Sequence, residues 1–357
     1  MAITLKDVLA AIAVVFNGLP LAMLALTYGF AAFPTALGFI VGGIGMVLTH
    51  QIAPISLQAE SIVLAGTIGR NRNERLNIVF FTGLLMSVIG LLGVLNATIE
   101  FIGPCILNAM MAGVGIMLAK SGYDMIKQNK FASGISILAA FIVYFATNDL
   151  IWTIVISVLL STGCHLIKTK GKAAELSGVD PSLEGFKPLK FEITPHVIRS
   201  VLAVCTLQIG GNISYATITA GLAGGKANVD AITVYSGLAD SASAFFGGGP
   251  VEAIISGTAA APNPLIAGLL LVGFLAAIFF SKTVPKIARY VPSQAIAGFL
   301  LVLGMFVVFP QDAQLALNES PIIGSAVIIV TSFSDPFIGM VVGVALKYAL
   351  PVLGFPV

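Results

Sequence analysis

Apolar stretches close to membrane-spanning length recur along almost the whole chain, and they limit its possible folds more than any other feature. Only 10% of the 357 residues are charged, whereas soluble globular domains carry about a quarter. A chain with so few charges cannot cover a water-exposed surface with them. The sequence therefore predicts an all-α polytopic membrane protein in the lipid bilayer, and it argues against one very apolar soluble core.

Apolar runs and the residues that interrupt them divide the chain into fourteen segments. Several segments are too short to cross a bilayer as helices, because a crossing helix needs about 20 residues. The segments are 8–30, 35–50, 54–68, 76–95, 102–119, 133–147, 150–167, 196–218, 229–246, 250–262, 264–281, 292–309, 319–333 and 336–351.

Two of the short segments carry an acidic residue. Segment 54–68 follows Pro54 and contains Glu60, and segment 250–262 follows three glycines and Pro250 and contains Glu252. Short segments interrupted by Gly or Pro, at matching positions in two halves of a chain, are typical of the binding site of a secondary transporter. The two segments therefore indicate where a solute would bind.

The two halves of the chain also resemble each other in sequence. "ESIVLAGT" from Glu60 is similar to "EAIISGT" from Glu252, and "FIGPCILNAMMAGVGIML" matches "YVPSQAIAGFLLVLGMFV", which pairs Gly115 with Gly304. Both matches lie about 190 residues apart. They predict an internal repeat, with Glu60 and Glu252 at pseudo-symmetric positions near the midplane.

Seven spans per half is an odd number, so the second half must be inverted relative to the first. The predicted fold is a 7+7 inverted repeat. Its first repeat covers residues 1–167, a polar linker covers 168–190, and the second repeat covers 191–357.

An ionised carboxylate at mid-bilayer costs at least about 2.5–3.5 kcal/mol. We therefore expect Glu60 and Glu252 to face a cavity, as solute contacts and as proton carriers. The alternative is a structural hydrogen bond to backbone freed where a helix breaks. Their neighbours Ala59, Ser61 and Val251 belong to the same predicted binding site.

The eighth segment adds further polar residues, chiefly Gln208 and Asn212, with Ser214 and Thr217 beyond them. Gln208 and Asn212 are one helical turn apart and share a face. An amide both donates and accepts hydrogen bonds, so this face could recognise a polar solute. Hydrogen bonding between helices is the alternative.

Other polar residues favour no catalytic, metal or cofactor site. Asp149, Asp240 and Asp335 lie near segment ends and read as helix caps or loop residues. The three His and three Cys are scattered, and no basic stripe suggests nucleic acid. We expect no enzyme activity, no metal and no cofactor.

Several stretches, in order, resemble the nucleobase–cation symporters, which include uracil, xanthine and guanine/hypoxanthine permeases. They are "ERLNIVFFTGLLMSVIGLLGVLNATIEFIGPCILNAMMAGVGIML", "GLADSASAFFGGGPVEAI", "YVPSQAIAGFLLVLGM" and "VIIVTSFSDPFIGMVVGVALKYAL". The resemblance implies a core domain, a gate domain, and two short crossing strands in segments 3 and 10 that hold a nucleobase. It also implies proton coupling and a homodimer.

The family's acidic positions match this chain only in part. The acid of the eighth span falls on Gln208, and the acid of the tenth span falls on Ser256 or Glu252, depending on the register. We choose Glu252, because the internal repeat supports it. Glu60 is not typical of the family's third span.

The sequence thus predicts a secondary active transporter of a small planar solute, foremost a purine or other nucleobase, by proton symport. A small-anion carrier of the sulfate-permease type on the same fold is the alternative, and a membrane-embedded enzyme is less favoured. Neither short segment contains Lys or Arg, and the two acids count against an anion. The solute, and proton versus sodium coupling, stay open.

Basic residues favour one side of the predicted membrane. Of the 18 Lys and Arg, only Lys6, Lys226 and Lys347 fall on the other side. The positive-inside rule makes the crowded side cytoplasmic, so both termini are predicted to be extracytoplasmic in the cell (inner) membrane. The nucleobase symporters usually have both termini inside.

Overall fold

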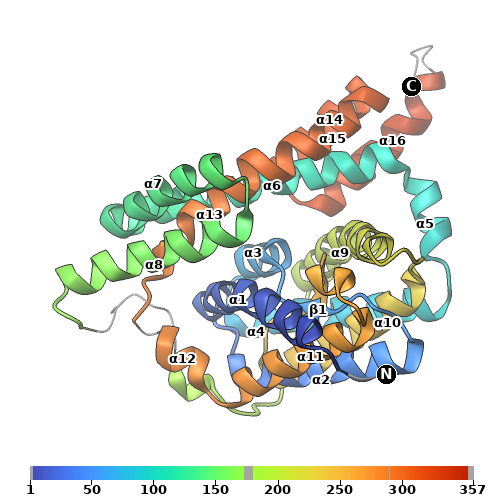
Figure 1. Cartoon of the computed structure of the whole chain (residues 1–357). Coiled ribbons are helices and arrows are strands. Elements are labelled where there is room, and N and C mark those ends of the chain that lie inside the picture. Colours follow the sequence, from blue (N-terminus) through green and yellow to red (C-terminus); the bar gives the residue numbers. More distant parts are fainter. Residues whose placement is uncertain (1–2, 173–179, 289, 353–357) are drawn as a thin grey trace. The chain divides into compact units, whose positions relative to one another are not determined.

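The computed structural model describes the whole chain except residues 1–2, 173–179, 289 and 353–357 (Figure 1). Its described residues are mostly helical, which confirms the predicted all-α class. Five described helices or helical runs are long and apolar enough to cross a membrane, judged by length and composition. They are Ala32–Thr49, Arg72–Leu91, Pro104–Gln128, Lys130–Thr147 and Ser293–Glu319.

The elements before the linker are eight helices and one very short strand. They are α1 (Leu5–Thr27), α2 (Ala32–Thr49), β1 (Ile55–Ser56), α3 (Ala59–Ile68), α4 (Arg72–Leu91), α5 (Leu95–Ile102), α6 (Pro104–Gln128), α7 (Lys130–Thr147) and α8 (Leu150–Lys168).

The elements after α8 repeat this plan. They are the 3-10 turn η1 (Pro181–Leu183), α9 (Pro195–Leu222), α10 (Val229–Phe245), β2 (Glu252–Ala253), η2 (Gly257–Ala260), α11 (Pro264–Phe280), α12 (Thr283–Ala288), η3 (Ser293–Ile296), α13 (Ala297–Val302), the π-helical stretch η4 (Leu303–Val308), α14 (Phe309–Glu319), α15 (Pro321–Phe333) and α16 (Pro336–Val352).

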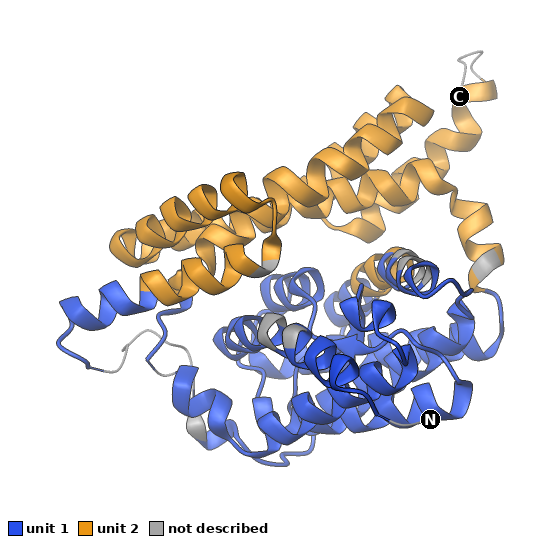
Figure 2. Ribbon diagram, in the orientation of Figure 1, with its two compact units in different colours: residues 1–94, 162–201, 211–293 blue, residues 95–161, 202–210, 294–357 orange. Residues whose placement is uncertain are grey.

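Two compact units form, and each collects segments from both halves of the chain (Figure 2). Unit 1 contains residues 1–94, 162–201 and 211–293, and unit 2 contains residues 95–161, 202–210 and 294–357. Units assembled from both halves agree with an inverted repeat that has core and gate domains. The repeat boundaries at residues 167 and 190 stay a prediction.

Close helix packing in unit 1 depends on small residues. Helix α10 packs against α4 and α2, and α2 packs against α11. A Cβ atom on Gly83 or Gly237 would overlap the carbonyl oxygen of the other glycine, so α4 and α10 touch backbone to backbone. Gly45 of α2 leaves room for the fully buried ring of Tyr235 in the same way.

Unit 2 is built around α6, which packs against α13, η4, α14 and α15. Gly115 of α6 faces Gly304 of η4: a Cβ atom on Gly304 would overlap the Gly115 carbonyl oxygen, and one on Gly115 would overlap the backbone nitrogen of Phe309. An apolar core including Ile106, Met110 and Val327 continues along the same helices.

The end of the linker is attached to unit 1. The Glu184 carboxylate accepts hydrogen bonds from the backbone N–H groups of Ala32 (2.9 Å) and Phe33 (2.6 Å) at the start of α2. Asn77 of α4 donates to the Lys190 carbonyl and accepts from the Glu192 N–H. The segment 184–192 therefore caps the start of α2 and is hydrogen-bonded to α4.

One segment is longer than the sequence suggested. The twelfth segment was predicted to end at residue 309, but the helical run continues through η4 and α14 to Glu319. In a hydropathy plot the span would end at the polar residues Gln311, Asp312 and Gln314. They lie instead on an amphipathic final stretch whose Ala313 and Ala316 are buried.

Candidate functional site

Two broken segments meet inside unit 1. After α2 the chain passes Pro54, forms β1 and starts α3; after α10 it passes three glycines and Pro250, forms β2 and starts η2. The strands pair antiparallel, with Ile55 opposite Ala253 and Ser56 opposite Glu252. The predicted short crossing strands in segments 3 and 10 are therefore present.

Two further hydrogen bonds join the crossing segments beside the strand pair. The Ile254 N–H donates to the Pro54 carbonyl at 3.0 Å, and Gln58 Nε2 donates to the Ala253 carbonyl at 3.1 Å. Proline has no N–H and does not continue a helix, so Pro54 and Pro250 favour extended backbone at these positions.

The strand register shows how the two acids lie along the crossing segments. Glu252 is directly opposite Ser56, which is four residues before Glu60. The predicted equivalence of Glu60 and Glu252 in the internal repeat stays a prediction, because an antiparallel register is compatible with any offset between the two halves.

Both acids are nonetheless buried in the same region of unit 1. Glu60 lies in the first turn of α3, and Glu252 lies in β2 opposite Ser56, four residues before Glu60. Ala59 and Ser61, which flank Glu60, and Val251, which precedes Glu252, are also buried. Together with Ser256, these five residues make six predicted site residues that come from the two crossing segments.

The start of α3 is suited to negative charge. The N-cap residue Gln58 makes no side-chain hydrogen bond to the first turn of the helix. The first N–H groups of a helix carry a partial positive charge, which favours an anion nearby. Buried hydroxyl groups of Ser56 and Ser61 belong to the same segment.

Ser256 has a structural role in the second crossing segment. It is the N-cap of η2, where its Oγ accepts from the Thr258 N–H at 3.2 Å and lies 2.7 Å from Thr258 Oγ1. Thr219 of α9 donates to the Ile254 carbonyl (2.9 Å) and accepts from the Ser256 N–H (3.3 Å). Helix α9 therefore runs beside β2 and η2.

The two predicted amides of α9 fall in different units. Gln208 is buried in the part of α9 that belongs to unit 2, and Asn212 is buried in the part that belongs to unit 1. Asn212 is seven residues, about two turns, before Thr219 and so shares its face. Among the described residues neither amide atom of Asn212 has a hydrogen-bond partner. The side chains of Ser214 and Thr217 lie outside the described part of the chain.

The acidic residues near segment ends divide into two kinds. Asp149 and Asp335 are caps, because their Oδ1 atoms accept from the Trp152 and Ile338 N–H groups. Asp240 lies within α10 instead, and its Oδ1 accepts from the Val251 N–H at 2.6 Å. Its position close to the glycines after α10 was the only sequence signal for this contact.

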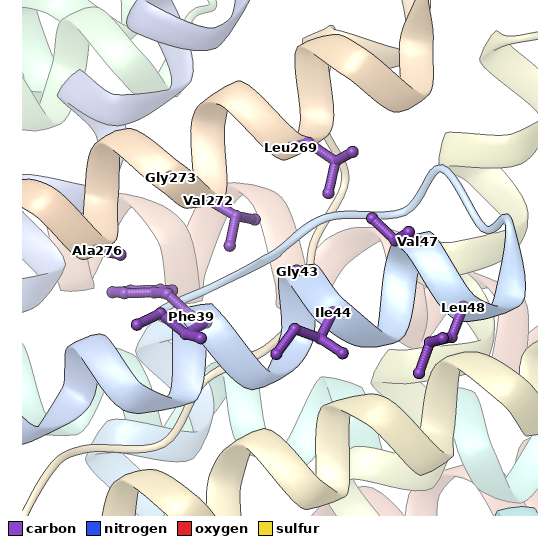
Figure 3. Close-up of a pocket in the computed structure, with 10 residues that line it drawn as sticks. Phe39, Gly43, Ile44, Val47, Leu48, Leu269, Val272, Gly273 and Ala276 are labelled. Carbon is purple, nitrogen blue, oxygen red and sulfur yellow. The ribbon is translucent and has the colours of Figure 1, made fainter.

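An apolar groove lies elsewhere in unit 1, between α2 and α11 (Figure 3). It encloses about 360 Å³ and is lined by Phe39, Ile40, Gly43, Ile44, Val47, Leu48, Leu269, Val272, Gly273 and Ala276. None of these side chains can form a hydrogen bond, so the groove offers nothing to orient a polar solute. It is therefore not the solute site.

The fold is similar to that of known anion transporters. No family model and no curated protein sequence matches the chain. Among solved structures, the transmembrane domain of the cyanobacterium bicarbonate transporter BicA is 15% identical, covers 95% of this chain and 96% of its own, and has a TM-score of 0.69. The similarity over nearly all of the chain confirms the polytopic membrane fold.

Two structures of SLC26A9 also match. The murine anion transporter Slc26a9 in the inward-facing state is 15% identical, with a TM-score of 0.68, covering 99% of this chain and 70% of its own. A second SLC26A9 structure is 14% identical, with a TM-score of 0.67, covering 98% and 65%. This chain thus spans about two thirds of the length of those proteins.

The predicted membership of the nucleobase–cation symporters is wrong, because these matching structures are anion transporters of the sulfate-permease and Solute Carrier 26 type. The two families share a fold and hence the order of their Gly/Pro interruptions and apolar spans. Gln208 and Glu60 are the two positions at which this chain departs from the acidic residues expected of the nucleobase symporters.

Proposed function

We propose that this chain is a secondary transporter of a small anion, of the sulfate-permease type. The observation that carries the proposal is the buried start of α3 beside the β1–β2 pair, where the N-cap residue Gln58 makes no side-chain capping bond. A discontinuous segment whose helix N-terminus lies inside a transporter fold is a recurrent site for an anionic group. The anion transporters with the same fold support this proposal over the other transport classes.

Neutral donors would bind the anion. The segments 54–68 and 250–262 contain no Lys or Arg, so the positive end of α3 and serine hydroxyls are the available partners. Asn212 can add an N–H donor, because its amide is buried on the face of α9 that Thr219 shares. Such donors suit a weakly bound small anion that must be released after transport.

The two acids then indicate the coupling ion. An ionised Glu60 in the first turn of α3 would repel an anion at the same helix end, whereas a protonated carboxyl group would donate a hydrogen bond to it. Glu252, paired opposite Ser56, can act in the same way. We therefore propose that anion and proton bind together, and that transport is symport.

A thermal-shift measurement tests this proposal on the purified protein. Because a ligand that binds only the folded state stabilises it, an anion at 100 times its Kd adds about 2.7 kcal/mol. Chloride and sulfate should raise the Tm more at pH 6 than at pH 8, and uracil should not raise it. No stabilisation by either anion at either pH would contradict the proposal.

The Glu60→Gln variant tests proton coupling, with Glu100→Gln, an exposed position on α5, as the control. Glutamine resembles the protonated acid, so stabilisation of Glu60→Gln by the anion should depend less on pH than that of the wild type, with Glu252 accounting for the remainder. The control should keep the pH dependence of the wild type. Proton coupling through Glu60 is ruled out if both variants keep it.

Membrane placement and assembly are part of the same proposal. The chain is further proposed to act in the cell membrane as a homodimer. Light scattering of the detergent-solubilised protein should give twice the mass of one chain, and a mass of one chain would contradict the dimer.

A further inference from the structure

Helix α10 reaches both crossing segments through polar side chains. Tyr235 Oη donates to the Ala53 carbonyl at 2.6 Å, two residues before β1. Asp240 Oδ1 accepts from the Val251 N–H at 2.6 Å, one residue before β2. Both side chains are buried, with 2% and 0% of their surface exposed. Helix α10 therefore forms a hydrogen bond with the backbone just before each strand.

The strands alone cannot fix their own positions. Each strand has only two residues, and a two-stranded pair is marginally stable even when it is longer. Two more hydrogen bonds hold the backbone of Gly249, which precedes β2. Ser243 Oγ of α10 donates to the Gly249 carbonyl (2.6 Å), and Thr35 Oγ1 of α2 accepts from the Gly249 N–H (2.9 Å). The position of Glu252 thus depends on side chains outside its strand.

Glycine is required where the chain doubles back toward α10. Gly247 has a φ of +100°, a conformation that other residues rarely adopt. A Cβ atom on Gly248 would overlap Ser243 Oγ and the Thr35 backbone. The backbone therefore lies directly on α10 and α2, which brings Val251 within reach of Asp240.

We infer that Tyr235 and Asp240 are positioning residues of the transport site, which hold β1 and β2 at the spacing that the solute requires. The inference rests on the proposed anion transport. Neither residue needs to touch the solute. Removing either hydrogen bond would leave a buried backbone group without its partner and let one crossing segment shift.

Ser241 provides a matched control on the same helix. Its Oγ donates to the Phe80 carbonyl of α4 at 3.1 Å, so Ser241→Ala also removes a hydrogen bond from α10. This bond does not involve either crossing segment. The variant separates a general loss of stability from a loss of positioning.

The test measures anion uptake by proteoliposomes that contain Tyr235→Phe, Asp240→Ala, Asp240→Asn or Ser241→Ala. Asp240→Ala should raise the KM for chloride about tenfold, and Tyr235→Phe should raise it several-fold. Asp240→Asn keeps an acceptor oxygen and should restore the KM to within about twofold of the wild type. Ser241→Ala should lower the Tm without changing the KM.

Unchanged KM values in Asp240→Ala and Tyr235→Phe would overturn the inference. Absence of uptake by the wild type would contradict the proposed function instead. In that case, amide hydrogen exchange still tests whether Tyr235 and Asp240 hold the two strands in place. Residues 53–56 should exchange faster in Tyr235→Phe, and residues 251–254 in Asp240→Ala, but neither stretch in Ser241→Ala. Equal protection in all variants would overturn the positioning role.

Discussion

At the scale of single residues, two glycines show how the halves of the chain are related. The sequence match pairs Gly115 with Gly304, and the structure places these two residues in contact within unit 2. Contact between equivalent residues is what a two-fold axis through a helix crossing produces. The absence of side chains here lets α6 and the π-helical stretch η4 approach closely.

Gly304→Ala should therefore destabilise the protein. Its Cβ atom would overlap the Gly115 carbonyl, and overpacking of this kind costs about 1–3 kcal/mol. Gly134→Ala in α7 is the control, because no atom lies within 4 Å of its Cβ position. Helix propensity predicts that this control is neutral or stabilising by up to about 1 kcal/mol. Equal Tm values for the two variants would show that the crossing is not tightly packed.

At the scale of elements, the start of α2 depends on a residue far away in sequence. Ala31, at the N-cap, offers no side-chain acceptor, and Glu184 supplies two from the linker. The Lys282 ammonium donates to the Glu184 carbonyl at 3.0 Å and lies over the Phe33 ring. The linker is therefore part of the helix terminus.

Glu184→Ala should lower the free energy of unfolding by about 1–2 kcal/mol, since two N–H groups of α2 lose their acceptor. The free energy of unfolding of Glu184→Gln should lie between those of Glu184→Ala and the wild type, because the glutamine amide keeps one acceptor oxygen. Asp124→Ala removes an exposed ion pair with Lys127 and should have almost no effect. The capping role fails if Glu184→Ala unfolds at the same denaturant concentration as Asp124→Ala.

Some elements could be predicted from sequence and others could not. Pro54 and the run Gly247 to Pro250 break apolar stretches visibly, so the two crossing segments were predictable. The pairing of Ser56 with Glu252 was not, because a two-residue strand has no periodicity to reveal its register. Contacts such as Glu184 with Ala32 join residues about 150 positions apart and leave no local signal.

At the scale of the whole molecule, the predicted polytopic all-α membrane fold agrees with the matching structures, while the predicted family does not. The fold depends on many apolar residues and on the Gly and Pro residues that interrupt them. Its prediction therefore tolerates errors at single positions. The predicted family relied on the order of a few short motifs, and the departures from its acidic positions at Gln208 and Glu60 were already visible in the sequence.

The distribution of Lys and Arg predicts that both termini are extracytoplasmic. A fluorescent protein that matures only in the cytoplasm should stay dark when fused to the C-terminus. Fusion to the polar linker near Lys172, on the crowded side, is the positive control and should fluoresce. A bright C-terminal fusion would contradict this orientation.

Uptake by proteoliposomes tests the central claim most directly. Purified protein is reconstituted, and labelled chloride and sulfate, whose charges do not change between pH 6 and pH 8, are added outside. The proposed symport predicts uptake that is faster with an acidic exterior and is lost when the proton gradient is collapsed. Uptake of neither anion under any gradient, with folded protein in the vesicles, would contradict anion transport by this chain.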